Sequence, residues 1–231
     1  MPAVLITGAN RGLGLEFARQ YARDGWLVFA ASRDPQRAEQ LRGLAKTANG
    51  KLNLLEMDVS DANSVRTAAS QLKDIAIDVL INNAGISGEP GQIIGNIDYE
   101  KWARVLDVNT LGPMRVTEAF VEIIARSQRR LIVTITSGIA SIADNTTGGW
   151  IAYRSSKTAV NMVMRSVAVE LAQCGIICVV VDPGWVKTDM GGPNAPLFPQ
   201  TSVAEIRRLI ERIDPQDSGK FFRYDGCEHA W

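Results

Sequence analysis

Six short apolar runs, separated by segments of helical period, constrain the fold of this chain more than any other feature. They are rich in β-branched residues and mostly continuous in their apolar character, as is typical of strands buried on both faces. The runs lie at residues 3–7, 26–31, 52–57, 77–82, 131–136 and 176–181. Helical periodicity lies between them, most clearly over 13–23, 99–126 and 151–172. Strands that alternate with helices predict right-handed crossovers and a parallel sheet.

The predicted fold class is α/β, a doubly wound Rossmann fold that occupies residues 1–231 as a single domain. A seventh candidate strand at 220–224 closes one edge of the sheet. We therefore expect about seven strands in a mostly or wholly parallel sheet, flanked by helices on both faces. The length of 231 residues and the 46% hydrophobic content suit one large buried core.

Charge and cysteine content argue against several functional classes. Lysine plus arginine and aspartate plus glutamate number 25 each, so the net charge of zero does not suggest a nucleic-acid surface. The three cysteines match no metal-ligand spacing and there is one histidine, so we expect no metal site. No apolar run approaches the roughly 20 residues of a membrane span. The first strand leaves no room for a signal peptide, and the predicted location is cytoplasmic.

The first strand is followed by a glycine-rich turn, TGANRGLG, with Gly8, Gly12 and Gly14. In doubly wound folds, ligands bind outside the carboxyl ends of the strands. Glycines let the backbone approach a pyrophosphate closely, and the next helix presents unpaired N–H groups to that anion. The turn predicts a dinucleotide site, although a tight strand–helix connection would also use glycines.

The end of the second strand favours NADP(H) over NAD(H). Ala31 and Ser32 are small and neutral, and Arg33 follows them, whereas an acidic residue usually binds the ribose of NAD here. Arg11 in the glycine turn is expected to face the same ribose, and two guanidinium groups suit a 2′-phosphate. Two alternatives remain: both arginines are solvated surface residues, or Asp34 binds a 2′-hydroxyl.

Polar residues and glycines also follow each of the remaining strands that border the predicted crevice. Asn82 and Asn83 lie in NNAG, where buried amides either border a cofactor or tie neighbouring loops together. The remaining candidates are Asp58 and Val59 after the third strand, Ser137 and Ser141 after the fifth, Tyr153 and Lys157 in YRSSK, and Pro183, Gly184 and Thr188 after the sixth. Tyr153 and Lys157 are four residues apart, so both lie on one helix face.

Taken together, these residues resemble the short-chain dehydrogenase/reductase family over essentially the whole chain. The turn is similar to its TGxxxGxG motif, NNAG to its central motif, YRSSK to its YxxxK and DPGWVKT to its PG–Thr segment. The stretches GANRGLGLEFA, KTDMGGPNAPL and GKFFRYDG resemble, more narrowly, its C-factor and sniffer-like carbonyl reductase branch.

The resemblance implies four catalytic residues. Tyr153 donates a proton to a carbonyl oxygen as hydride arrives, and Lys157 lowers the tyrosine pKa from about 10 and binds the nicotinamide ribose. Ser137 holds the substrate oxygen, and Asn109 holds a water that links Lys157 to solvent. Ser137 precedes Tyr153 by 16 residues, more than in many members of the family, and Ser141 is its competitor.

The resemblance also implies the rest of the binding region. Cofactor contacts are expected from Gly8, Arg11, Gly12, Leu13, Gly14, Arg33, Asp58, Val59, Asn82, Ala84, Gly85, Tyr153, Lys157, Pro183, Gly184, Val186 and Thr188. A short flap at about 187–200 is expected over an open apolar pocket. Its expected lining is Trp150, Trp185, Met190 and Leu197. The long helices around 99–126 and 151–174 are surfaces for a homodimer or homotetramer.

The predicted function is an NADP(H)-dependent oxidoreductase that reduces a carbonyl group of an aldehyde, ketone or quinone to an alcohol. Two alternatives stay open. The same residues would serve a secondary-alcohol dehydrogenase, because the sequence does not set the direction of the reaction. A cofactor-binding signalling or redox-sensing protein of the C-factor type would use the same fold, but it has no need of a proton donor.

Overall fold

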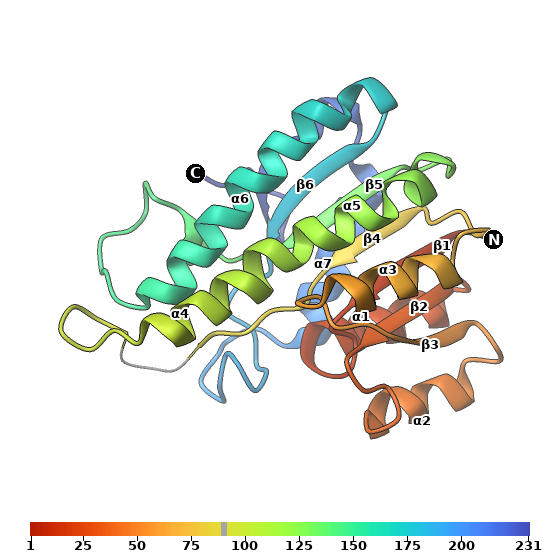
Figure 1. Cartoon of the computed structure of the whole chain (residues 1–231), viewed down its shortest axis with the longest axis horizontal. Coiled ribbons are helices and arrows are strands. Elements are labelled where there is room, and N and C mark those ends of the chain that lie inside the picture. The colour runs from red at the N-terminus through yellow and green to blue at the C-terminus, as the bar shows by residue number, and fades with distance from the viewer. Residues whose placement is uncertain (89–91) are drawn as a thin grey trace.

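A parallel sheet with the strand order β3-β2-β1-β4-β5-β6-β7 forms the centre of the computed structural model, which describes residues 1–88 and 92–231 (Figure 1). The strands are β1 (Ala3–Thr7), β2 (Leu27–Ser32), β3 (Leu52–Glu56), β4 (Val79–Asn82), β5 (Leu131–Ile135), β6 (Ile177–Asp182) and β7 (Phe221–Arg223). All neighbouring pairs are parallel, which confirms the predicted fold class. The strand order reverses between β1 and β4, so a crevice is expected at their carboxyl ends.

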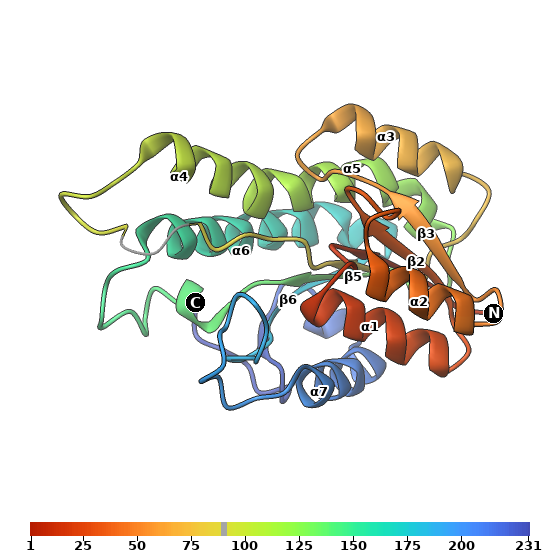
Figure 2. The same cartoon turned by 90° about the horizontal axis from the view of Figure 1, so that it is seen from below.

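Helices cover both faces of this sheet (Figure 2). They are α1 (Gly12–Arg23), α2 (Glu39–Thr47), α3 (Ala62–Gln71), α4 (Tyr99–Leu106), α5 (Gly112–Ala125), α6 (Ile151–Leu171) and α7 (Pro199–Arg212). Helices α3, α5 and α6 share one buried apolar cluster with the sheet. Helices α1, α2 and α7 share a second cluster on the opposite face. Because both faces are covered, the inner strands are buried and mostly apolar, whereas Asn53 and Glu56 of the edge strand β3 are exposed.

The helix expected over 99–126 is interrupted. A π-helix at Asp107–Leu111 separates α4 from α5. This interruption could not be predicted, because DVNTL continues the helical pattern and contains no helix breaker. π-Helical turns occur frequently at functional sites, and this one carries Asn109.

Residues 227–231 fold back over the end of β7. Glu228 pairs with Phe222 in an isolated antiparallel bridge, and the His229 backbone N–H donates to Phe221 O at 2.7 Å. The His229 ring stacks on the Phe221 ring with centroids 4.5 Å apart. This return brings His229 to the carboxyl edge of the sheet. Among the described helices, none has the length and apolar character needed to cross a membrane.

Candidate active site

The glycine turn is locked to the end of β4. Gly8 has φ +65°, and a Cβ there would lie 2.8 Å from Ala84 Cα, so only glycine fits. Thr7 Oγ1 accepts hydrogen bonds from the backbone N–H groups of Asn83 and Ala84, each at 3.0 Å. Thr7 was missed by the sequence reasoning, although it immediately precedes the turn. These contacts fix the two strand ends on either side of the crevice.

The first turn of α1 has the features of an anion-binding helix N-terminus. Its N-cap residue Arg11 makes no side-chain capping bond, and the turn contains no acidic residue. The N–H groups of Gly12, Leu13 and Gly14 therefore lie at a helix N-terminus without a protein carboxylate. A Cβ on Gly14 would lie 2.3 Å from Gly8 O, so the backbone is packed as closely as a pyrophosphate cradle requires. These residues fit a dinucleotide cofactor.

The basic residues expected beside the adenosine ribose are exposed at the crevice edge. Arg33 is exposed after β2, and it forms no ion pair within the described part of the chain. Arg11 pairs with Asp189 at 2.8 Å, and both side chains are largely exposed. Asp34, the alternative ribose ligand, instead accepts from the Arg37 backbone N–H at 3.1 Å and pairs with its side chain.

Asp58 lies close to Arg33 at the same edge. Burial raises the pKa of Asp58, but hydrogen bonds from Ser60 and the positive charges of Arg33 and Arg104 outweigh burial, so the pKa is lowered overall. Val59, the next residue, is buried against Gly112 at the start of α5. The carboxylate is thus ionised and held in place at neutral pH.

The side chains of both asparagines of NNAG tie neighbouring elements together. The Asn82 amide donates to Thr117 and Thr134, 2% of the residue is exposed, and its Oδ1 atom has no described partner. Its side chain therefore belongs to the layer between the sheet and α5. Asn83 donates to Thr7 O at 2.9 Å and so ties loops together. Any cofactor contact of Asn82 would have to come from its backbone.

The segment after β6 approaches the glycine turn. Pro183 O accepts from Ser202 Oγ at 2.7 Å, and Gly184 turns the chain with φ +77°. Thr188 Cγ2 lies 3.5 Å from the position a Cβ would take on Gly12. Val186 is buried and pairs with Leu197.

The predicted catalytic serine lies beside the predicted catalytic tyrosine. The Ser137 hydroxyl is near enough to the Tyr153 phenol to lower its pKa. Ser141 instead accepts from Asp144 N and donates to Trp231 O, so the structure favours Ser137 over its competitor. Burial raises the pKa of Tyr153 to about 12, the Ser137 hydroxyl lowers it in part, and the charge of Asp182 adds to the rise. Tyr153 is therefore a protonated phenol at neutral pH.

Lys157 lies on the same face of α6, as predicted. Its Nζ atom donates to Ile135 O at 2.9 Å and lies 5.8 Å from the centroid of the Tyr153 ring. Burial lowers the pKa of Lys157 to about 8. The pKa of Tyr153 is raised overall because burial of the phenol dominates, and its lowering by Lys157 stays a prediction.

Asn109 completes this group from the π-helix. Its side chain accepts from Ile86 N at 2.8 Å and donates to Ile86 O at 2.8 Å and Ser156 Oγ at 3.0 Å. A Cβ on Gly85 would lie 3.3 Å from Asn109 Oδ1 and 3.5 Å from Lys157 Nζ. Gly85 follows Ala84, which packs on Gly8, so the catalytic candidates and the glycine turn share one crevice.

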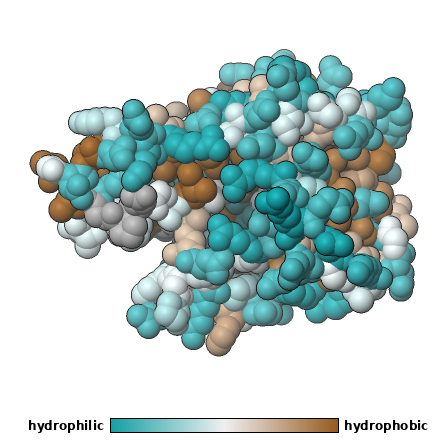
Figure 3. All heavy atoms as spheres, turned by 60° about the horizontal axis from the view of Figure 1, so that its bottom comes forward, coloured by the Kyte–Doolittle hydropathy of each residue, from teal (hydrophilic) through white to brown (hydrophobic). Residues whose placement is uncertain are grey.

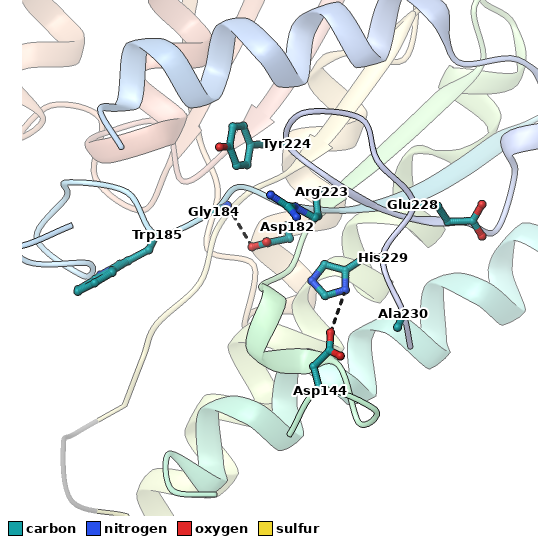
Figure 4. A pocket seen from close by; sticks show the side chains of 9 residues that line it. All are labelled: Asp144, Asp182, Gly184, Trp185, Arg223, Tyr224, Glu228, His229 and Ala230. Atoms are coloured by element: carbon teal, nitrogen blue, oxygen red, sulfur yellow. Dashed lines mark hydrogen bonds and ion pairs between the residues drawn. The ribbon is translucent and has the colours of Figure 1, made fainter. Parts of the chain in front are cut away.

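The neighbouring cavity differs from the expected apolar pocket. A cavity of about 520 Å³ is lined by Asp144, Asp182, Gly184, Trp185, Arg223, Tyr224, Glu228, His229 and Ala230 (Figure 4). Of the four residues predicted to line a pocket, only Trp185 contributes to it. The polar lining was not predictable because it comes mainly from residues 223–230, which the fold returns to this edge. Apolar side chains gather instead at the α4 end of the molecule (Figure 3), where Ile93 and Ile94 are exposed.

The predicted flap is a closed loop that ends where α7 begins. The Lys187 backbone N–H donates to Leu197 O at 2.8 Å, and Leu197 N donates to Trp185 O at 3.3 Å. Trp185 Nε1 donates to Gly191 O at 2.8 Å across the loop. Helix α7 starts at Pro199, so the last two residues of the predicted range belong to that helix.

Comparisons with known proteins agree with this geometry. A family model described as short chain dehydrogenase matches residues 2–196. The C-signal protein of Myxococcus xanthus is 43% identical over 167 residues, which cover 72% of this chain and 100% of that protein.

Solved structures are similar over the whole chain. Carbonyl reductase Sniffer of Drosophila melanogaster has a TM-score of 0.94 and 33% identity, and covers 100% of both chains. An NADPH-bound carbonyl reductase from chicken fatty liver has a TM-score of 0.93 and 33% identity, over 100% of this chain and 99% of that one. The chain therefore belongs to the short-chain dehydrogenase family, with relatives of the C-factor and sniffer type.

Proposed function

We propose that this chain is an NADP(H)-dependent carbonyl reductase that converts an aldehyde, ketone or quinone to an alcohol. The observation that carries the proposal is the convergence of Ser137, Tyr153, Lys157 and Asn109 beside the glycine turn. A binding protein needs the glycine turn but has no need of a serine beside a tyrosine proton donor. The carbonyl reductases among the similar structures, one of them bound to NADPH, support the same reaction class.

The side chains act in an order that the geometry supports. Bound NADPH supplies a hydride to the carbonyl carbon. Ser137 holds the carbonyl oxygen by a hydrogen bond, and Tyr153 gives that oxygen its phenolic proton, leaving a phenolate. Lys157, whose pKa of about 8 leaves it mostly cationic at neutral pH, would stabilise the phenolate and hold the nicotinamide ribose. Asn109 would hold the water through which a proton returns from solvent.

The proposed cofactor contacts come from the glycine turn and from the two arginines at the edge of the crevice. The N–H groups of Gly12, Leu13 and Gly14 would hold the pyrophosphate, and Arg11 and Arg33 the 2′-phosphate.

Turnover tests the proposal. NADPH oxidation is followed at 340 nm with the purified protein against aldehydes, ketones and quinones, with NADH as the alternative cofactor. We expect turnover with NADPH. Tight NADPH binding without turnover of any compound would argue instead for a signalling role, which similarity to the C-signal protein favours.

Arg33→Asp tests the cofactor preference. We expect NADPH to bind about 10–100-fold more weakly, because a charge-assisted phosphate contact of about 1.5–3 kcal/mol is lost, while NADH affinity changes little. Isothermal titration calorimetry measures both. Arg37→Asp is the matched control, since Arg37 already pairs with Asp34 and its side chain is 90% exposed. If the variant binds NADPH and NADH more weakly by the same factor, Arg33 does not recognise the 2′-phosphate.

We also propose that residues 187–198 act as a substrate flap within a single-domain enzyme. The loop lies between the cavity and the glycine turn, and hydrogen bonds at its base hold its two ends together. Hydrogen exchange with and without NADPH checks this. We expect slower exchange at 187–198 when the cofactor binds, and unchanged exchange would contradict the flap.

The outer face of α6 supports a homodimer or homotetramer. Met162 and Val169 are seven residues apart on this helix and are 67% and 66% exposed. Leu111, at the end of the π-helix, is also exposed. Light scattering after gel filtration is expected to give twice or four times the mass of 25.1 kDa. A monomer at micromolar concentration would contradict the assembly.

A further inference from the structure

The polar cavity at the carboxyl edge of the sheet has a negatively charged lining (Figure 4). Three carboxylates line it, each from a different segment of the chain: Asp144, Asp182 and Glu228. Among the described lining residues, Arg223 is the only lysine or arginine, and it pairs with Asp225 at 3.1 Å. The lining is therefore negative overall, whether or not the imidazole of His229 carries a proton.

One of these carboxylates has an oxygen atom without a partner. Asp182 is 9% exposed, and its Oδ1 atom accepts a hydrogen bond from Gly184 N at 3.0 Å. This bond accounts for one of the two oxygens. No donor among the described residues bonds Oδ2, and the side chain lines the cavity. A buried carboxylate oxygen without a donor or a cation is costly, so Oδ2 points to a group that a ligand supplies.

Two aromatic side chains, Trp185 and Tyr224, line the same cavity. Trp185 Nε1 donates to Gly191 O at 2.8 Å, which fixes the indole. The Tyr224 ring packs on Gly184, where a Cβ would lie 3.0 Å from Cδ1 and Cε1. The faces of tryptophan and tyrosine rings attract cations, and aromatic side chains recognise quaternary ammonium groups in this way. Carboxylates and aromatic rings around one cavity therefore suit an organic cation.

The cavity adjoins the residue proposed to hold the substrate oxygen. A Cβ on Gly138 would lie 3.0 Å from Asp182 Oδ2 and 3.3 Å from His229 Nε2. Gly138 directly follows Ser137, so the backbone beside the serine is open toward these lining residues. The cavity volume of about 520 Å³ lies within the roughly 300–1,000 Å³ of small-molecule sites. A substrate whose carbonyl group lies at Ser137 thus has room to extend into the cavity.

We propose that this cavity binds an ammonium group of the substrate, at the end remote from the carbonyl. The preferred substrates are then aldehydes or ketones that carry a quaternary or tertiary ammonium group. Asp182 and Glu228 supply the negative charge, and Trp185 and Tyr224 supply the ring faces. The ammonium group takes no part in the hydride step. The inference rests on the proposed reductase function and names a substrate class for it.

A pair of aldehydes of the same shape tests this substrate class. One is para-(trimethylammoniomethyl)benzaldehyde, and the other is its neutral isostere para-neopentylbenzaldehyde. The methylene group separates the charge from the carbonyl, so the two differ mainly in what the cavity binds. We expect the parent protein to favour the cationic aldehyde in kcat/KM by at least about fivefold, because cation–π contacts and charge pairs add.

Glu228→Gln keeps the shape of the side chain and removes its charge. The preference for the cationic aldehyde should fall by about 2–5-fold, the effect of losing one exposed charge pair. Glu170→Gln is the matched control, since Glu170 is an exposed carboxylate in the last turn of α6, whereas Tyr153 lies in the first. It should leave the preference unchanged.

A second readout does not depend on turnover. Benzyltrimethylammonium has no carbonyl group, and calorimetric titration measures its affinity for the NADPH complex. Trp185→Leu removes the ring face but keeps apolar bulk, and it should weaken this binding by about 2–5-fold. Equal kcat/KM for the two aldehydes in the parent protein would overturn the proposal and leave the reductase function intact. Binding that weakens in Trp185→Leu and in Glu228→Gln, without turnover of any aldehyde, would support the ammonium site and reject the reductase function.

Discussion

Tyr153→Phe is expected to lower kcat for NADPH-dependent carbonyl reduction by about 10²–10⁴-fold, the usual contribution of a positioned general acid. The ring remains in place, so the loss reports the missing proton and not a cavity. The pKa of about 12 means that the phenol is protonated across the whole working range of pH. NADPH affinity should change less than threefold, because the pyrophosphate cradle is untouched.

The control for this variant is Tyr99→Phe. Tyr99 begins α4, is 72% exposed and has no part in the proposed chemistry. Stopped-flow measurement of a single turnover separates the chemical step from product release. A Tyr153→Phe protein that turns over as fast as the Tyr99→Phe protein would remove Tyr153 from the mechanism.

Gly14→Ala is expected to abolish measurable cofactor binding, with a loss of at least about 100-fold in affinity. The new Cβ would lie 2.3 Å from Gly8 O and 2.6 Å from Asn83 Nδ2, so the turn must move away from β4. Overpacking of this kind destabilises a protein by about 1–3 kcal/mol. Calorimetric titration with NADPH and thermal unfolding measure the two effects.

Gly43→Ala is the matched control. Gly43 lies within α2, and a Cβ there meets nothing within 4 Å. Alanine is favoured over glycine inside a helix by about 0.5–1 kcal/mol, so this protein should unfold at a slightly higher temperature and bind NADPH normally. Normal NADPH binding by Gly14→Ala would show that the cofactor does not use the turn.

The sequence predicted the sheet and the strand-end residues well, because both depend on local pattern. Continuous apolar runs separated by helical segments allow few topologies, and the crossover rule then brings the carboxyl ends together at one edge. Ser137, Tyr153 and Lys157 could thus be grouped before any coordinates, and the structure brings them together.

The features that escaped prediction depend on tertiary contacts. The π-helix around Asn109 is stabilised by contacts to Ile86 and Ser156, which no local pattern encodes. The raised pKa of Tyr153 follows from burial, which spacing along a helix does not reveal. Asp182 and His229 line one cavity only because the segment after β7 folds back, so the polar character of the cavity could not be predicted from the sequence.

Isotope transfer distinguishes a carbonyl reductase from a protein that only binds the cofactor. NADPH carrying deuterium at C4, prepared separately with the label on each face, is incubated with the protein and a carbonyl compound. Mass spectrometry then locates the label. We predict that one of the two labelled forms transfers one deuterium to the carbinol carbon of the alcohol for each NADPH consumed, and that the other form transfers none. Binding of NADPH with no labelled alcohol from any compound would contradict it.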